Sequence, residues 1–432
     1  MPISASNISA TGNIKFQPAP IVFGDPHRYW RILVEEMITT SNNRWRLSQI
    51  DFWENEFGRP LTFLGTVTAS SEFSTSPISN ATNELISRST TNDLDNFQTS
   101  STFIPHWVQI DFGVGNTYEV NNIVLWDTAR TPSDAAGWRA KSGRVQWSDN
   151  GTDWTDHYTF DALEDSDWTG TNLNPFKLLN PNLPPHQAID LELSNAFDPL
   201  YIMDLSKNNL VFSDNGITQA NNNDPIYLID SQVSGASNFE QPTTANRVTF
   251  KTGGTNGWNY LESDGTAKYF EDVPFTQPSG VANYNPWAII AVCEDIAGLD
   301  DFPSLWGANN ASGFGKAGAY FRETANEQWH FWKSNNRRYN IPSGMFVIGG
   351  QGASTTAVRN YLDGQQVIET NSSNMTSSAV TNANVLRNQQ SASNGYFNGK
   401  LYYMAIVDNI SSVNFYRACE WARGKWKVGA WS

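Results

Sequence analysis

The sequence is 432 residues long, with 28 Lys plus Arg against 43 Asp plus Glu, a formal charge of −15, and 17 Trp. A chain of that length is too long for one compact core, so two or three domains are expected. The acidic balance argues against a nucleic-acid or anionic-membrane partner, because phosphate binding needs a basic surface. No window approaches the roughly 18 consecutive apolar residues of a membrane span, so no membrane insertion is expected.

The first segment, residues 1–24, is small and polar, contains Pro18 and Pro20, and has Lys15 as its only charged side chain. It has neither a basic leader nor a continuous apolar stretch, so we expect no secretory signal. Two interpretations stay open. The segment is either a flexible tail or an arm that becomes ordered on a neighbouring subunit of a larger assembly.

Between Trp107 and Trp154 apolar and polar residues alternate, which is the period of strands with one buried face. The predicted strands cover 107–113, 122–126 and 144–147. The residues expected to face a core are Val108, Ile110, Phe112 and Val145, together with Trp107 and Trp154. Before Trp154, the sequence Ser-Asp-Asn-Gly predicts a hairpin in which Asn150 and Gly151 supply the positive φ angles of a tight turn.

The same stretch carries a resemblance to a known family. Its order, Trp-Val-Gln-Ile-Asp-Phe-Gly, then an apolar strand, then Val-Gln-Trp-Ser-Asp-Asn-Gly-Thr-Asp-Trp, resembles the discoidin or coagulation-factor C-type domain. Three upstream segments match in the same order, and they are 27–32, 45–52 and 93–100. The resemblance implies a galactose-binding-like jelly roll over 25–165, a fold used mostly for binding sugars, lipids or proteins.

The rest of the chain predicts a linker and a second sandwich. Residues 166–190 are rich in proline and cannot sustain a sheet interior, which is typical of a linker. From 191 to 432, short apolar runs alternate with turn-rich connections, as in an antiparallel sandwich. Near its end, 413–426 predicts a short amphipathic helix. The expected fold class is all-β, with two antiparallel β-sandwich (jelly-roll) domains in tandem, an extended N-terminal arm and a short C-terminal helix.

The second half also resembles a family, the laminin-G-like or concanavalin-type jelly rolls of bacteriophage and bacterial surface proteins. The motifs that carry this resemblance are Leu-Tyr-Ile-Met-Asp-Leu-Ser over 200–206, the hairpin Tyr-Leu-Asp-Gly over 361–364 and Phe-Asn-Gly-Lys-Leu over 397–401. In such modules a terminal helix ending in Lys-Trp closes the domain, and this chain has Lys425 and Trp426. Both families include members with a structural Ca²⁺, and no cofactor is required.

The candidate binding residues lie in loops. In discoidin-like families the ligand sits at the loop end of the sandwich, which here means the loops 66–105 and 127–142. Sugar sites pair an aromatic platform with polar partners, and the candidates of this kind are Phe73, Phe97, His106, Arg130, Trp138 and Arg139. A second set in the C-terminal sandwich is Trp332, Arg337, Arg338 and Tyr339. For both sets the alternative is a packed or merely solvated residue.

Metal, catalytic and thiol chemistry have weaker signals. Asp93 and Asp95 are the candidate Ca²⁺ ligands, with a solvated acidic turn as the alternative. Glycoside hydrolysis needs two carboxylates, and the nearest pattern, Glu262 and Asp264, lacks the third acidic residue of Glu-x-Asp-x-x-Glu. We therefore expect no enzyme. The two cysteines, Cys293 and Cys419, are either buried thiols or one bridge.

Together these features predict a non-enzymatic, adhesive virion protein of a bacteriophage, as a tail fibre, a baseplate adhesin or a head decoration protein. It would assemble in the host cytoplasm, lie on the virion surface, bind a host cell-surface glycan and contact other virion proteins through its N-terminal arm. A homotrimer is compatible with this interpretation. The alternatives are a polysaccharide-acting enzyme and a carbohydrate-binding bacterial surface protein.

Overall fold

The computed structural model describes most of both predicted sandwiches. The described residues are 26–38, 43–54, 60–83, 96–127, 138–161, 163, 175–180, 199–233, 236–274, 288–294, 304–308, 317–322, 328–331, 342–354, 357–363, 365–370, 382–387, 396–407 and 410–426. Within these residues no helix combines the length and apolar character needed to cross a membrane.

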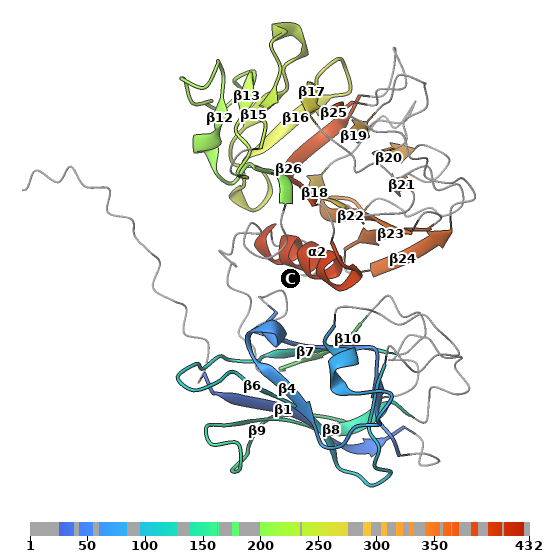
Figure 1. Ribbon diagram of the computed structural model, residues 1–432. Helices are drawn as coiled ribbons and strands as arrows, with labels where there is room; N and C mark the ends of the chain where they lie inside the picture. Colours follow the sequence, from blue (N-terminus) through green and yellow to red (C-terminus); the bar gives the residue numbers. More distant parts are fainter. Residues whose placement is uncertain are drawn as a thin grey trace, which may run out of the picture.

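The first sandwich contains a five-stranded antiparallel sheet in the order β4-β6-β1-β8-β9, seen in the lower half of Figure 1. Its strands are β1 (Tyr29–Met37), β4 (Thr66–Ala69), β6 (His106–Asp111), β8 (Ala140–Ser148) and β9 (Thr155–Phe160). A three-stranded sheet in the order β10-β7-β3 lies opposite, with β3 (Gln49–Trp53), β7 (Asn122–Trp126) and β10 (Phe176–Leu179). A short pair joins β2 (Arg46–Leu47) to β5 (Phe97–Gln98).

Alternation along β6 decides which residues form the first core. Val108 and Ile110 are fully buried, and Val108 pairs across the sheet with Ile32. Trp107 lies on the opposite, outer face and is only half-buried, so the expectation that it faces the core is wrong. The physical reason is the period of two, which sends neighbouring side chains to opposite faces. Trp154 is also half-buried, and the guanidinium carbon of Arg31 lies 4.0 Å from its ring centroid.

The turn between β8 and β9 is longer than the tight reversal expected from its sequence. The Asn150 side chain accepts backbone hydrogen bonds from Thr152 (2.9 Å) and Asp153 (2.8 Å), so it caps the turn. Of the predicted Asn-Gly pair, Gly151 has a positive φ of 75° and Asn150 does not. Asn150 therefore stabilises the turn through its side-chain hydrogen bonds and not, as the sequence predicted, through a positive φ angle.

Part of the predicted linker is a strand. β10 pairs antiparallel with β7, with Lys177 opposite Val124, and forms the edge of the three-stranded sheet. An edge strand needs hydrogen bonds on one side only, so it tolerates the proline-rich surroundings that exclude a sheet interior. Residues 176–179 thus belong to the first sandwich, while the other predicted domain bounds stay predictions.

The second sandwich has a large sheet in the order β15-β16-β26-β18-β22-β23-β24, in which β11 also pairs with β26. The strands of this sheet are β11 (Pro199–Asp204), β15 (Thr249–Lys251), β16 (Tyr260–Asp264), β18 (Ala288–Glu294), β22 (Met345–Ser354), β23 (Ala357–Leu362), β24 (Gln365–Thr370) and β26 (Asn398–Val407). Its central strands β18 and β26 are buried along nearly their whole length, which explains their continuous apolar sequences.

Two smaller sheets complete the second sandwich. One has the order β17-β25-β19-β20-β21 and contains β17 (Phe270–Pro274), β19 (Ser304–Ala308), β20 (Ala317–Arg322), β21 (Gln328–Phe331) and β25 (Asn382–Val385). The other has the order β12-β13-β14 and contains β12 (Val211–Phe212), β13 (Leu228–Ile229) and β14 (Phe239–Glu240). The predicted all-β class with a C-terminal helix is confirmed.

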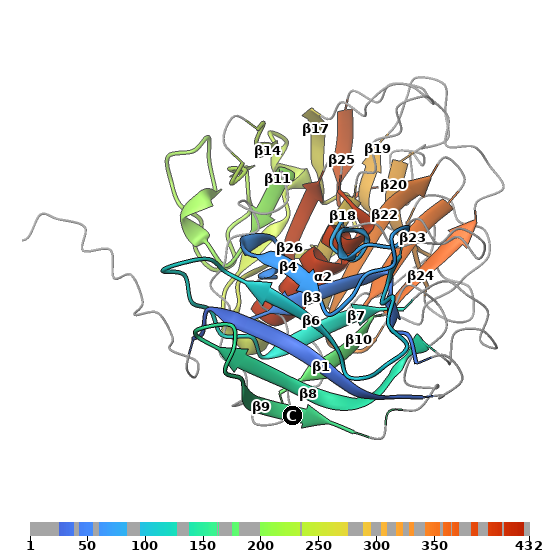
Figure 2. The same ribbon diagram turned by 60° about the horizontal axis from the view of Figure 1, so that its bottom comes forward.

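Helix α2 (Ser412–Trp426) lies between the two sandwiches, as Figures 1 and 2 show. The Ser411 hydroxyl caps its first turn by accepting a hydrogen bond from the Asn414 backbone (3.1 Å). At the other end Lys425 forms a buried ion pair with Asp204 on β11, and Trp426 is fully buried. The helix that the sequence predicted therefore closes the second sandwich.

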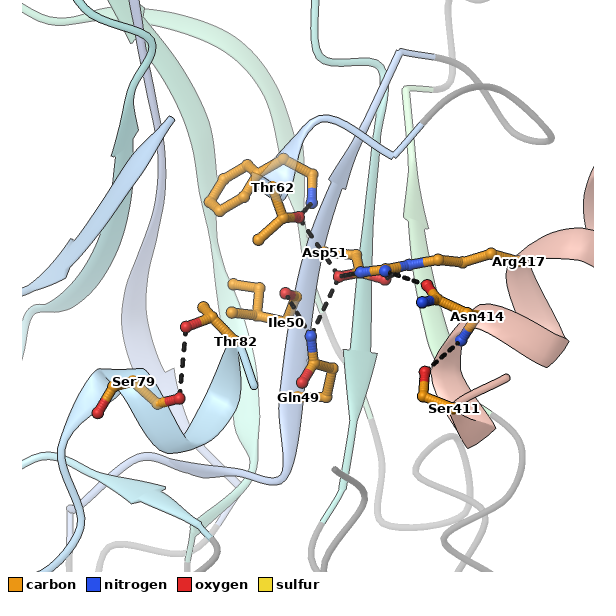
Figure 3. Close-up of polar contacts among 10 residues, drawn as sticks. Gln49, Ile50, Asp51, Thr62, Ser79, Thr82, Ser411, Asn414 and Arg417 are labelled. Atoms are coloured by element: carbon orange, nitrogen blue, oxygen red, sulfur yellow. Dashed lines mark hydrogen bonds and ion pairs between the residues drawn. The ribbon is translucent and has the colours of Figure 1, made fainter. Parts of the chain in front are cut away.

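The other side of α2 packs on the first sandwich. The ring of Tyr416 lies 6.5 Å from that of Trp53 and 5.8 Å from that of Trp126, centroid to centroid. Figure 3 shows Arg417 reaching from α2 to the carboxylate of Asp51 on β3. Every residue of β7 is buried because one face meets the first core and the other meets this helix layer.

Both cysteines are free and buried. Of the two alternatives that the sequence left open, the buried-thiol interpretation is confirmed and the bridge is wrong. Burial raises the pKa of both the Cys293 and the Cys419 thiol. Neither thiol is therefore poised to act as a nucleophile.

Candidate functional site

One end of the first sandwich gathers most of the loop residues singled out by the sequence. β1 ends, and β6 and β8 begin, at this end, because Val34 pairs with His106 and Met37 pairs with Ala140. Backbone hydrogen bonds join the loops to one another, from Ser70 to the Trp107 carbonyl at 2.9 Å, for example. We call this surface the loop end; its described segments are 43–46, 70–76, 98–106 and 138–139.

Gln98 on β5 ties the loop end together. Its backbone carbonyl accepts a hydrogen bond from Phe73 (2.9 Å), and its own N–H donates to the Ser76 carbonyl (3.0 Å). Its side-chain carbonyl accepts a hydrogen bond from the guanidinium of Arg46, the residue that it faces across the β2–β5 pair. The loop that carries Phe73 is thereby fixed relative to Arg46.

Two aromatic rings at the loop end each lie against a guanidinium. The Arg44 guanidinium carbon is 5.3 Å from the centroid of the Phe73 ring, and that of Arg46 is 3.8 Å from the Trp138 ring. Such cation–π contacts hold the ring and the cation in a fixed relative position. Phe73 keeps 37% of its surface exposed and Trp138 is half-buried. Arg46 is itself buried (4% exposed), so only the Arg44–Phe73 pair places an exposed aromatic surface beside a partly exposed guanidinium.

More apolar surface and several hydroxyls surround these pairs. Phe103 is 82% exposed and Ile104 is 40% exposed, in a loop joined to the Phe73 loop by a hydrogen bond from Ser101 to the Ser71 hydroxyl (3.2 Å). The exposed hydroxyl-bearing residues of these loops are Ser74, Thr75, Ser100 and Thr102. Hydroxyls donate and accept hydrogen bonds, so this surface suits a ligand that carries both polar groups and apolar faces.

Three of the predicted binding residues are buried. Phe97 and His106 have no exposed surface, and Arg139 has 2% of its surface exposed. The expectation that these three residues contact a ligand is therefore wrong. Phe97 packs edge-on against Trp45, and Arg139 is paired with Asp127. These residues hold the loop end in place.

His106, predicted to bind a ligand, instead has a structural role because it is buried. Burial lowers its pKa, against a smaller opposing effect of the hydrogen bond to the backbone of Asn43. The neutral ring donates that bond through Nε2, with 2.5 Å between Nε2 and the carbonyl oxygen. It therefore anchors the segment that leads to Arg44.

The remaining candidates lie outside the described residues. They are Arg130, Trp332, Arg337, Arg338 and Tyr339, and the proposed calcium ligands Asp93 and Asp95. Within the described part of the chain, no group of three or more His, Cys, Asp or Glu residues converges as a metal site would require. The calcium site and the second binding set stay predictions.

The sequence did not single out Arg44, Arg46, Gln98 or Phe103. Arg46 lies in the segment 45–52, which resembles a family strand, and Arg44 directly precedes that segment, so their loop-end position was not apparent. Phe103 could have been found, because Phe103-Ile104-Pro105 is an apolar run inside a Ser- and Thr-rich loop. Pairings such as Arg44 with Phe73 join segments without any common periodicity, so only the folded chain shows them.

The carboxylates closest to a hydrolase pattern are engaged within the protein. Glu262 forms an ion pair with Lys251 (3.1 Å). Asp264 accepts hydrogen bonds from the backbone and hydroxyl of Thr266. Burial acts to raise the pKa of Asp264, but these hydrogen bonds outweigh it and the pKa is lowered. An acid held ionised in this way is poorly suited to donate a proton to a leaving group.

Comparisons with known proteins find local likeness to solved structures only. No family model matches the sequence, and no curated protein matches it. Among the similar solved structures is domain 4 of AbnA, a GH43 extracellular arabinanase from Geobacillus stearothermophilus in complex with arabinotriose, at 10% identity and a TM-score of 0.29, covering 52% of this chain and 98% of that one.

Two further similar structures have comparable scores. The CBM40 of Ruminococcus gnavus IT-sialidase bound to sialyllactose shares 11% identity, with a TM-score of 0.26, over 37% of this chain and 96% of that one. The enzymatically active domain of tailspike protein 2 of bacteriophage CBA120 shares 11% identity, with a TM-score of 0.26, over 40% of this chain and 29% of that one. Scores in this range do not indicate a common function. None of these three structures is described as a discoidin or laminin-G module, so the resemblance to those two families stays a prediction.

Proposed function

We propose that this protein is a non-enzymatic glycan-binding component of a virion surface, and that the loop end of its first sandwich is the binding site. The observation that carries the proposal is the exposed ring of Phe73, held against Arg44 and bordered by hydroxyl-bearing loops. Sugar rings have apolar C–H faces that pack on aromatic rings and polar edges that need donors and acceptors. The loop end supplies both kinds of contact.

The rigidity of the loop end supports the proposal. Binding is weakened when side chains and loops must be ordered by the ligand. Here Gln98 fixes the Phe73 loop, while the buried His106 and the Arg139–Asp127 pair fix its neighbours. The described part of the site thus needs little further ordering before a ligand arrives.

The virion context rests on the sequence: two binding-type sandwiches, a polar N-terminal segment and the absence of a recognisable catalytic set. In this proposal the N-terminal arm contacts other virion proteins and the sandwiches face outward towards the host glycan. Imaging of particles that carry a labelled copy of the protein tests the location. Label confined to a bacterial envelope would replace the virion assignment by the surface-protein alternative.

The binding test uses the full chain on a glycan array. The wild-type protein is expected to bind at least one glycan class, and Phe73→Ala is expected to weaken that binding by about tenfold, because a stacked ring contributes on the order of 1 kcal/mol or more. Phe63→Ala is the matched control, since Phe63 is 58% exposed but precedes β4 at the opposite end of the sandwich. If both variants lose binding, or if neither does, the loop end is not the binding site.

The enzymatic alternative has its own test. Incubation with the glycans that the array identifies is expected to release no reducing sugar. If sugar is released and Asp264→Asn abolishes the release, the protein is a hydrolase and the non-enzymatic proposal is wrong.

A further inference from the structure

The arginines of the first sandwich fall into groups, and Arg31, which contacts Gln146 and the Trp154 ring, resembles Arg44 in lying against a ring. Three of those arginines meet a carboxylate, in the pairs Arg28–Asp111, Arg139–Asp127 and Arg144–Glu35. Among the described residues Arg44 has no such partner, and its guanidinium lies against the ring of Phe73. Its Nε is buried without a hydrogen-bond acceptor. The protein therefore positions this guanidinium through a ring and not through an anion.

A guanidinium in that state is suited to one kind of ligand group. Its planar set of N–H donors matches the two oxygens of a carboxylate, and a charge-assisted pair of this kind is among the strongest hydrogen-bonded contacts that a protein makes. Arg28 and Arg144 make such two-oxygen contacts within this protein, to Asp111 and Glu35. Those two contacts use Nε together with a terminal nitrogen. Because the Nε of Arg44 is buried, a ligand carboxylate would meet Arg44 through its two terminal nitrogens.

The surroundings of Arg44 restrict the ligand further. Phe73 offers an apolar face next to the cation, and Ser74, Thr75 and Ser100 offer exposed hydroxyls. A sugar acid has the matching groups, namely a C–H face, hydroxyls and a carboxylate on one ring. The net charge of −15 repels anions at long range, so any preference for an acid must come from this local contact.

We propose that the loop end selects acidic glycans, with the carboxylate of a uronic or sialic acid on Arg44 and the sugar ring against Phe73. This inference rests on the proposed glycan-binding function and names its substrate class. Glu72, which is exposed beside Phe73, lies on the same surface and works against an anionic ligand. Its removal by Glu72→Gln is expected to strengthen acidic-glycan binding modestly, by about twofold, in keeping with the small effect of exposed charges.

The test compares each acidic glycan with its own methyl ester, printed side by side on an array, so that only the carboxylate charge differs. The full wild-type chain is expected to bind the acid about tenfold more tightly than the ester. Arg44→Gln is expected to abolish this difference, and Arg44→Lys to keep part of it, because lysine retains the charge without the planar donor set. Arg28→Gln, at the opposite end of the sandwich, is the matched arginine control and is expected to keep the full difference.

Each outcome separates the inference from the function on which it rests. Equal binding of acids and esters would overturn the acidic-glycan inference and leave glycan binding standing. Binding of no glycan at all would overturn the proposed function itself. Binding to phosphatidylserine vesicles together with binding to no glycan would overturn both and assign the surface, with its exposed Phe103, to a lipid headgroup. Thermal unfolding of Arg44→Gln close to the wild-type temperature would show that a lost preference is not a lost fold.

Discussion

Arg417 on α2 and Asp51 on β3 form an ion pair across 366 positions of sequence, with side-chain exposures of 3% and 0%. The Nε–Oδ2 distance is 2.9 Å, and a second guanidinium nitrogen binds Oδ1, so the contact is bidentate. The carboxylate also accepts hydrogen bonds from Gln49 (3.2 Å) and Thr62 (3.3 Å), as Figure 3 shows. This pair joins the two sandwiches at a point that water does not reach.

We expect Asp51→Asn to lower the free energy of unfolding by about 3–5 kcal/mol, because the cation of Arg417 stays buried without its counter-ion. The double variant Asp51→Asn/Arg417→Gln is expected to lose less than the sum of its parts, and chemical denaturation of the four proteins measures the coupling. Glu36→Gln, which breaks the exposed Lys141 pair, is the control and should cost less than about 1 kcal/mol. Additive losses in the double variant would show that the buried pair does not act as a unit.

Gly349 on β22 sets how closely α2 approaches the sheet. A Cβ at this position would lie 2.7 Å from the Cys419 sulfur and 2.9 Å from the Phe415 ring. Gly349→Ala is therefore expected to destabilise the protein by about 1–3 kcal/mol through overpacking. Adding Cys419→Ala removes one of the clashing atoms and should recover part of the loss in a thermal melt. A double variant less stable than Gly349→Ala alone would contradict this account.

Asp363 makes stability depend on pH. Burial raises its pKa to about 6, against the opposing effects of the Val347 backbone hydrogen bond and of Arg423, while the charge of Glu420 acts in the same direction as burial. Folding thus favours the protonated form of Asp363. The contribution of this proton to the free energy of unfolding is complete below the ordinary pKa of 3.8, and it is lost as the pH rises through about 6.

We expect the wild type to gain about 1 kcal/mol of stability relative to Asp363→Asn when the pH falls from about 7 to about 5. The amide still accepts the hydrogen bond from Val347 (2.8 Å), so the variant is a close structural match. Glu420 does not interfere in this window, because its pKa is lowered: burial raises it, but the charges of Lys177 and Arg423 outweigh burial. Parallel pH profiles of the two proteins would refute the assignment to Asp363.

The two thiols provide a probe of folding. Cys293 and Cys419 are buried, and burial raises the pKa of each, so neither is expected to react with a thiol reagent in the native protein. Both should react once denaturant unfolds the second sandwich, and the count of modified thiols by mass spectrometry checks this. Rapid labelling of Cys419 alone under native conditions would mean that α2 detaches from the sheet.

Local patterns predicted much of the fold. The strand 122–126 and the helix near 413–426 match β7 and α2 closely, because period-two alternation and helical spacing are properties of short segments. Trp107 was assigned to the wrong face, since an apolar side chain next to Val108 cannot share its side of a strand. The strand β10 was missed because proline-rich sequence indicates a linker and carries no signal of a neighbouring edge.

At the candidate site, the sequence located the loops that carry aromatic and cationic residues, but it did not show which of those residues reach the surface. Phe73 and Trp138 lie at the loop end beside arginines, whereas Phe97, His106 and Arg139 support it from within. An aromatic or cationic residue in a polar loop is compatible with either role. Burial decides between them, and burial depends on segments that the loop meets only after folding.

The sequence by itself determined the all-β class, the C-terminal helix and the loops in which a binding site was to be sought, because these follow from local periodicity and composition. The tertiary structure decided that α2 is shared by both sandwiches and that Arg44 lies against Phe73. Contacts of this kind join residues far apart in the chain, as Asp51 and Arg417 do. Their geometry comes from the packing of sheets and the exclusion of water, which no short stretch of sequence encodes.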